Sequence, residues 1–171
     1  MNTQTIELTT LSNLVANEDY CRKVLPFLKS TYFDIKEQRI IFEEIHNFVD
    51  KYKKVPTKIS LEIEVEQRKD LTETEHSKIV EIIKTLDSTD VDIEWLLDTT
   101  EKFCKDKAIY NAIVEGISII DGKDKNKSAD SIPSILTDAL AVSFDNAVGH
   151  DYLLDSDTRF EYFHRIEERV P

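Results

Sequence analysis

The sequence has few of the residues that form tight turns. Among its 171 residues there are three glycines and four prolines. A β protein built of short strands and tight turns needs more of both, whereas Leu, Ile, Glu and Lys favour helices. We therefore expect an all-α protein, and the length suits one domain of ordinary size.

Cysteines and long apolar runs are scarce as well. Cys21 and Cys104 have neither paired nor metal-type spacing, so we expect no disulfide scaffold. No stretch approaches the ~20 uninterrupted apolar residues of a membrane span. The N-terminal segment MNTQTIELTT lacks the basic start and the apolar run of a signal peptide. We expect a cytoplasmic protein that does not contact membranes.

Positive charge is also in short supply, because the formal net charge is -12. The acidic residues are spread along the chain instead of forming a tail. Such a surface repels phosphate, so this chain is not expected to grip nucleic acid by itself. A basic protein partner suits it better, although any single acidic cluster is more often a solvated helix face.

Apolar residues recur at helical spacing in seven segments. Thr72 and Glu75 are spaced as a capping box at the start of one of them. The alternating segment LEIEVE could form a strand, but it has no evident partner strand, so we predict a short helix that Pro56 opens. The expected helices cover residues 3–15, 18–28, 34–53, 60–67, 72–86, 92–120 and 131–144, with Pro26 ending or kinking the second.

The last two predicted helices form an antiparallel hairpin, residues 92–144, around the polar loop DGKDKNKSAD. The first of them should span roughly 40 Å at ~1.5 Å per residue, which is longer than a compact core of this size needs. If the hairpin projects, its far end must bury Ile113, Ile117, Ile132 and Leu136 on something else. The simplest partner is a second copy of the chain.

Motifs for catalysis are missing. The glycines at 116, 122 and 149 are isolated, and none belongs to a phosphate-binding loop. Glu-x-x-His, a spacing used by di-iron bundles, occurs at 43/46, 73/76 and 161/164. A glutamate-rich chain produces it easily, and such centres also need bridging glutamates, so we expect no metal site.

The segment SFDNAVGHDYLLD raises the question of a catalytic pair at His150 and Asp151. Adjacent side chains usually diverge, so a turn at Gly149 with Asp151 as a cap is favoured. Beyond it, Phe160, Phe163 and Ile166 have the spacing of an amphipathic helix, which predicts a binding surface. The final Pro171 is no natural terminus, so we expect the native chain to continue.

Several segments resemble the N-terminal region of the DnaB-like hexameric replicative helicases of T-even-type phages. The most specific motif is SFDNAVGHD, within the matching stretch AVSFDNAVGHDY (141–152). Other matches are VLPFLKSTYF (24–33), LTETEHSKIVEIIKTL (71–86), WLLDTTEKFCKDKAIYNA (95–112) and, more weakly, RVP (169–171). The resemblance spans nearly the whole chain in order. The loop DGKDKNKSAD has no counterpart in it.

This resemblance implies a helical N-terminal collar domain at 1–145, and a junction and linker helix at 146–171 that lead to a RecA-like motor domain. In such helicases the hairpins pair subunits as dimers within a hexamer, and the linker helix, here with Phe160, Phe163 and Ile166, docks on a neighbouring motor. ATP, Mg and most contacts with single-stranded DNA belong to that motor. For this segment the resemblance implies no cofactor and no catalysis of its own, but docking of a primase or a helicase loader.

Two other hypotheses remain open at this point. The chain could be a free-standing helical adaptor that binds a partner through its C-terminal amphipathic helix. It could also be a carboxylate-bridged metal enzyme, which would contain stoichiometric iron.

Overall fold

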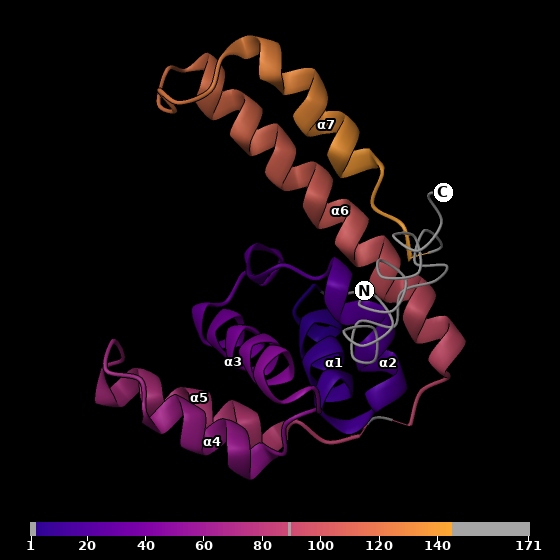
Figure 1. Cartoon of the computed structure of the whole chain (residues 1–171), viewed down its shortest axis with the longest axis vertical. Helices are drawn as coiled ribbons and strands as arrows, with labels where there is room; N and C mark the ends of the chain where they lie inside the picture. Colours follow the sequence, from indigo (N-terminus) through magenta and orange to yellow (C-terminus); the bar gives the residue numbers. More distant parts are fainter. Residues whose placement is uncertain (1–2, 89, 145–171) are drawn as a thin grey trace, which may run out of the picture.

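A computed structural model describes residues 3–88 and 90–144, which form seven α-helices, three short 3-10 helices and no strand (Figure 1). The all-α prediction is therefore confirmed. The first three helices are α1 (Thr3–Ala16), α2 (Glu18–Val24) and α3 (Lys36–Tyr52). Asn17 caps α2 because its side-chain oxygen accepts a hydrogen bond from the Tyr20 amide at 3.0 Å.

Helix α2 ends earlier than we predicted from the sequence. The chain leaves the α-helix after Val24 and forms the 3-10 helix η1 (Leu25–Phe27). Pro26 lies in this turn, where the missing amide hydrogen ends the α-helical pattern. A second 3-10 helix, η2 (Ser30–Tyr32), leads to α3.

The next two helices, α4 (Lys58–Glu66) and α5 (Glu73–Thr85), form an antiparallel pair that packs on α3. The helical prediction for residues 60–67 is confirmed, and the strand alternative is wrong. The role predicted for Pro56 is wrong too, because Thr57 is the N-cap and Pro56 lies before it. Thr72 and Glu75 form the predicted capping box at the start of α5.

The hairpin consists of α6 (Ile93–Ile120) and α7 (Ile132–Leu140), with the 3-10 helix η3 (Ala129–Ser131) before α7. Figure 1 shows it projecting from the core at the end opposite the α4–α5 pair. Leu96, Phe103 and Cys104 in the first half of α6 are buried in the core. Its second half extends beyond the core and packs on α7.

The returning helix is shorter than the predicted span of 131–144. It ends at Leu140, and the chain then turns back towards the core. The rings of Phe144 and Phe27 pack with their centroids 4.8 Å apart. This contact with η1 holds the base of the hairpin and competes with continuation of the helix.

None of the helices in residues 3–88 and 90–144 combines the length and the apolar character needed to cross a membrane.

A buried hydrogen bond joins α2 to α6. The Thr100 hydroxyl donates to the Leu96 carbonyl oxygen at 2.8 Å, so the Tyr20 hydroxyl, 2.7 Å from Thr100 Oγ1, donates to Thr100. Both side chains are fully buried. Burial raises the pKa of Tyr20 to about 12, which keeps the donor protonated.

We predict that Tyr20→Phe lowers the free energy of unfolding by about 1 kcal/mol, because it leaves a buried acceptor without its donor. Urea denaturation followed by circular dichroism measures this loss. Tyr110→Phe is the matched control, since the Tyr110 side chain is exposed. Equal effects of the two substitutions would contradict the assigned role of the Tyr20 hydroxyl.

Candidate assembly surface on the helical hairpin

One side of α6 carries a continuous apolar surface that no other segment within residues 3–88 and 90–144 covers. Ile113, Ile117 and Ile120 are 49%, 53% and 73% exposed, and Tyr110 and Val114 are exposed as well. Spacings of three and four residues place all five on one side of the helix. We call these five residues the hairpin stripe.

The opposite side of α6 faces α7 through small residues. Ala112 and Gly116 on α6 and Ala139 on α7 are buried. A Cβ placed on Gly116 would lie 3.5 Å from Ile132 Cγ2, which shows how closely the two helices approach. Because α7 occupies this side, it leaves the hairpin stripe open to solvent.

The tip of the hairpin is fixed by a Schellman motif at the end of α6. Gly122 has φ +68°, and its amide donates to the Ile119 carbonyl oxygen at 3.0 Å. The Lys123 amide donates to the Ser118 carbonyl oxygen at 3.0 Å. Lys127 then forms an ion pair with Glu115, which ties the loop back to α6.

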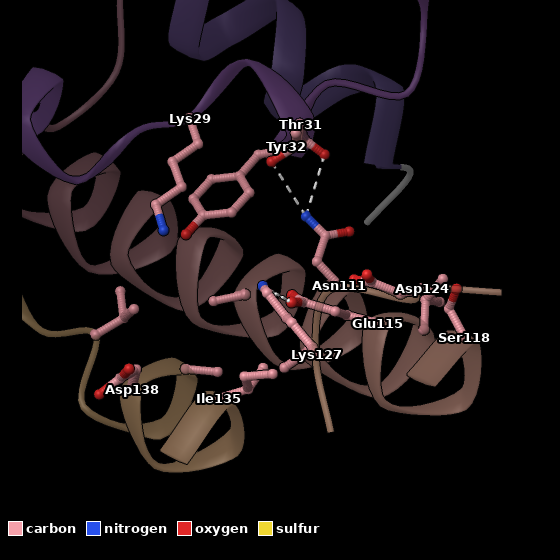
Figure 2. Close-up of a pocket in the computed structure, with 15 residues that line it drawn as sticks. Lys29, Thr31, Tyr32, Asn111, Glu115, Ser118, Asp124, Lys127, Ile135 and Asp138 are labelled. Atoms are coloured by element: carbon pink, nitrogen blue, oxygen red, sulfur yellow. Dashed lines mark hydrogen bonds and ion pairs between the residues drawn. The ribbon is translucent and has the colours of Figure 1, made fainter. Parts of the chain in front are cut away.

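Two grooves border the hairpin. The groove in Figure 2, about 590 Å³, separates the hairpin from η2, and its wall includes Lys29, Tyr32 and Asp138. Asn111 Nδ2 donates to the Thr31 carbonyl oxygen at 3.3 Å and so joins α6 to η2 beside this groove. Its lining mixes lysines with carboxylates and does not form a cationic site for phosphate.

The second groove has a volume of about 830 Å³ and lies at the base of α6. Trp95, Phe103 and Tyr110 supply its aromatic lining, and Lys102 lies among them. Trp95 is exposed and lies on the same side of α6 as the hairpin stripe. This aromatic groove therefore continues the stripe towards the core.

The structure separates the four hairpin residues that we predicted to bind a partner. Ile113 and Ile117 point outward, whereas Ile132 and Leu136 are half-buried on the hairpin's inner side. Tyr110 and Val114, which the sequence analysis did not single out, join the outward group. Their spacing relative to Ile113 and Ile117 was the available signal for them.

The other predicted site residues lie outside the described part of the chain. These are the junction residues Gly149, His150 and Asp151, and the linker residues Phe160, Phe163 and Ile166. The same holds for the Glu-x-x-His pair at 161/164.

Of the two remaining Glu-x-x-His pairs, the pair at 73/76 lies in the first turn of α5, and the pair at 43/46 takes part in structural contacts. His46 Nδ1 lies 3.4 Å from an Asp50 oxygen, and Glu43 lies 3.5 Å from an Arg68 nitrogen. Within residues 3–88 and 90–144, no three His, Cys, Asp or Glu side chains are grouped so that they could hold a metal ion. Burial raises the pKa of Cys21 and of Cys104 to about 12, so both thiols stay protonated.

The fold and its exposed stripe define a helical domain with a projecting hairpin. Residues 1–98 match the family model described as the DnaB-like helicase N-terminal domain. The chain is 32% identical over 169 residues to the DnaB-like replicative helicase of Enterobacteria phage T4, an alignment that covers 94% of this chain. The chain belongs to the family of DnaB-like helicase N-terminal domains, and the resemblance seen in the sequence is confirmed. It spans 35% of the length of the phage T4 relative.

Gly116 provides a test of the close packing within the hairpin. A Cβ at 3.5 Å from Ile132 makes an ordinary van der Waals contact, so Gly116→Ala should raise the free energy of unfolding by about 0.8–1 kcal/mol through helix propensity. Gly116→Leu should lower it by about 1–3 kcal/mol, because the longer side chain forces α7 away. Denaturant unfolding of the two variants measures both effects. If Gly116→Leu is as stable as Gly116→Ala, the two helices are not closely packed.

Proposed function

We propose that this chain is the N-terminal assembly and partner-docking domain of a replicative hexameric DNA helicase that acts in the cytoplasm of a phage-infected cell. The exposed hairpin stripe carries this proposal, and family membership supports it. In this account hairpins from two subunits pair, and the pairs collect into a collar above the motor ring.

The shape of α6 supports pairing in antiparallel orientation. The stripe is a ridge near the tip, and the aromatic groove lies on the same side nearer the core. A two-fold axis between two hairpins sets the ridge of each copy against the groove of the other. Both copies then bury the same residues, as a symmetric interface requires.

The amount of exposed apolar surface indicates a weak pair. Fully burying an isoleucine contributes about 1.5–3 kcal/mol, so each half-exposed isoleucine of the stripe contributes about 1 kcal/mol. Six such residues in a pair contribute about 6 kcal/mol, against an association cost of at least about 4 kcal/mol. Stable assembly therefore draws on further contacts around the ring, where linked domains have a high effective concentration.

The remaining parts of the proposal concern the rest of the helicase. Residues 1–145 are the collar domain, and residues 146–171 are a junction and a linker helix that docks on a neighbouring motor domain. Single-stranded DNA, ATP and Mg bind mainly to the motor. The net charge of -12 supports a basic docking partner, and a primase or a helicase loader is the partner we propose.

We predict that the double substitution Ile113→Ser/Ile117→Ser weakens self-association of residues 1–171 by about tenfold or more, since about 2 kcal/mol of apolar burial is lost per copy. Sedimentation equilibrium over a wide concentration range measures the dimer constant. The melting temperature should change little, because both side chains are already about half exposed in the protomer. Deleting the hairpin is a poorer test, because α6 supplies Leu96, Phe103 and Cys104 to the core.

Ile59→Ser/Ile63→Ser is the matched control. These isoleucines are also on a helix and exposed, but they lie on α4, away from the hairpin. Self-association should be unchanged in this variant. Equal association of the hairpin variant and the wild-type chain would overturn the proposed role of the stripe.

A further inference from the structure

Helix α4 exposes a second apolar surface. Ile59 is 71% exposed and Ile63 is 49% exposed, whereas Leu61 and Val65 on the other side of the same helix are fully buried. Single exposed apolar side chains are common on protein surfaces. Two isoleucines four residues apart on a nine-residue helix form a ridge, because they lie one turn apart on the same side.

Carboxylates border this ridge on one side. At 100° per residue, Glu62 and Glu66 lie next to Ile59 on the solvent side of α4. Neither carboxylate forms an ion pair with another residue in the described ranges. We call Ile59, Glu62, Ile63 and Glu66 the α4 face.

Two cations near the α4 face, Lys58 and Arg68, are already engaged elsewhere. Lys58 pairs with Asp87 at 2.5 Å and donates to the Lys84 carbonyl oxygen. Arg68 pairs with Glu44 at 3.0 Å and with Asp70 at 2.7 Å. The α4 face therefore presents apolar side chains beside two carboxylates that form no ion pair within the described residues.

The position of α4 keeps this surface free when hairpins pair. In Figure 1 the α4–α5 pair lies at the opposite end of the molecule from the α6–α7 hairpin. An interface on the hairpin stripe does not cover it. The two apolar surfaces can therefore serve different partners at the same time.

We propose that the α4 face docks a basic amphipathic helix of another protein. In this complex, apolar residues of the partner pack on Ile59 and Ile63, and lysine or arginine side chains pair with Glu62 and Glu66. The proposal rests on the proposed docking role and assigns it a surface and a partner chemistry.

Charge favours a basic partner helix over three other candidates for the α4 face: a second copy of the chain, nucleic acid and residues 151–171. Two α4 faces paired symmetrically bring four carboxylates together, which disfavours a second copy. Nucleic acid is repelled by the same carboxylates. Residues 151–171 of this chain contain six acidic residues and three arginines, a net charge of -3, so they are poorly matched to an acidic surface.

The experiment titrates isotopically labelled residues 1–171 with a synthetic helical peptide that carries leucines on one side and lysines on both flanks. Amide chemical shifts locate the site, and the dissociation constant is fitted from the same titration. We expect shifts centred on α4. Ile59→Ser/Ile63→Ser and Glu62→Lys/Glu66→Lys should each weaken binding by about tenfold or more.

The matched control is Glu73→Lys/Glu81→Lys, which makes the same change in net charge at two exposed positions on α5. Its affinity for the peptide should stay within about threefold of the wild-type value, because salt screens charges that do not lie next to the bound peptide. A peptide with glutamate in place of lysine should bind at least about tenfold more weakly.

Three results would overturn the proposal: shifts centred on another surface, equal losses in the α4 and α5 charge variants, or equal binding of the acidic peptide. The hairpin variant Ile113→Ser/Ile117→Ser should bind the basic peptide like the wild-type chain. The two proposals are therefore tested separately. Sedimentation tests whether the hairpin mediates self-association, and the peptide titration tests whether the α4 face is a docking site.

Discussion

The length of α6 is the constraint on which the account depends. A 28-residue helix extends about 42 Å at ~1.5 Å per residue, and the core covers only its first half. Helix α7, with nine residues, covers one side of the second half through Ala112, Gly116 and Ala139. The remaining side of α6 carries a row of three exposed isoleucines, Ile113, Ile117 and Ile120. A helix with apolar residues on more than one side needs a second partner, and within the described residues α7 is the main element packed on this half of α6.

Apolar surface and charge are distributed differently at the two ends of the molecule. The hairpin stripe consists of Tyr110, Val114 and three isoleucines, so two copies can meet on it without bringing like charges together. The α4 face sets two isoleucines beside two carboxylates, so two copies repel there and a basic partner is favoured. Under the proposed function, this division would allow one small domain to pair with a second copy at one end and to bind a different protein at the other.

Features determined by short-range chemistry were predictable from the sequence. The capping box of Thr72 and Glu75 and the end of α6 before Gly122 follow from local hydrogen bonding and backbone preference. Other features depend on contacts between distant segments. Helix α7 ends at Leu140 where the chain turns back and Phe144 meets Phe27, which lies more than a hundred residues earlier. From spacing alone we grouped Ile132 and Leu136 with Ile113 and Ile117 in one partner-binding surface. Spacing does not reveal which side of each hairpin helix faces the other helix. The α4 face escaped prediction for the same reason.

Solvent access to individual isoleucine methyl groups tests the central claim most directly. Methyl NMR of the wild-type chain with a soluble paramagnetic agent reports which isoleucines become covered as protein concentration rises. The account predicts that Ile113, Ile117 and Ile120 lose relaxation enhancement together at high concentration, whereas Ile59 and Ile63 keep it. Unchanged access at all three hairpin positions, or parallel loss at Ile59 and Ile63, would contradict the claim that the open side of α6 is the surface through which copies assemble.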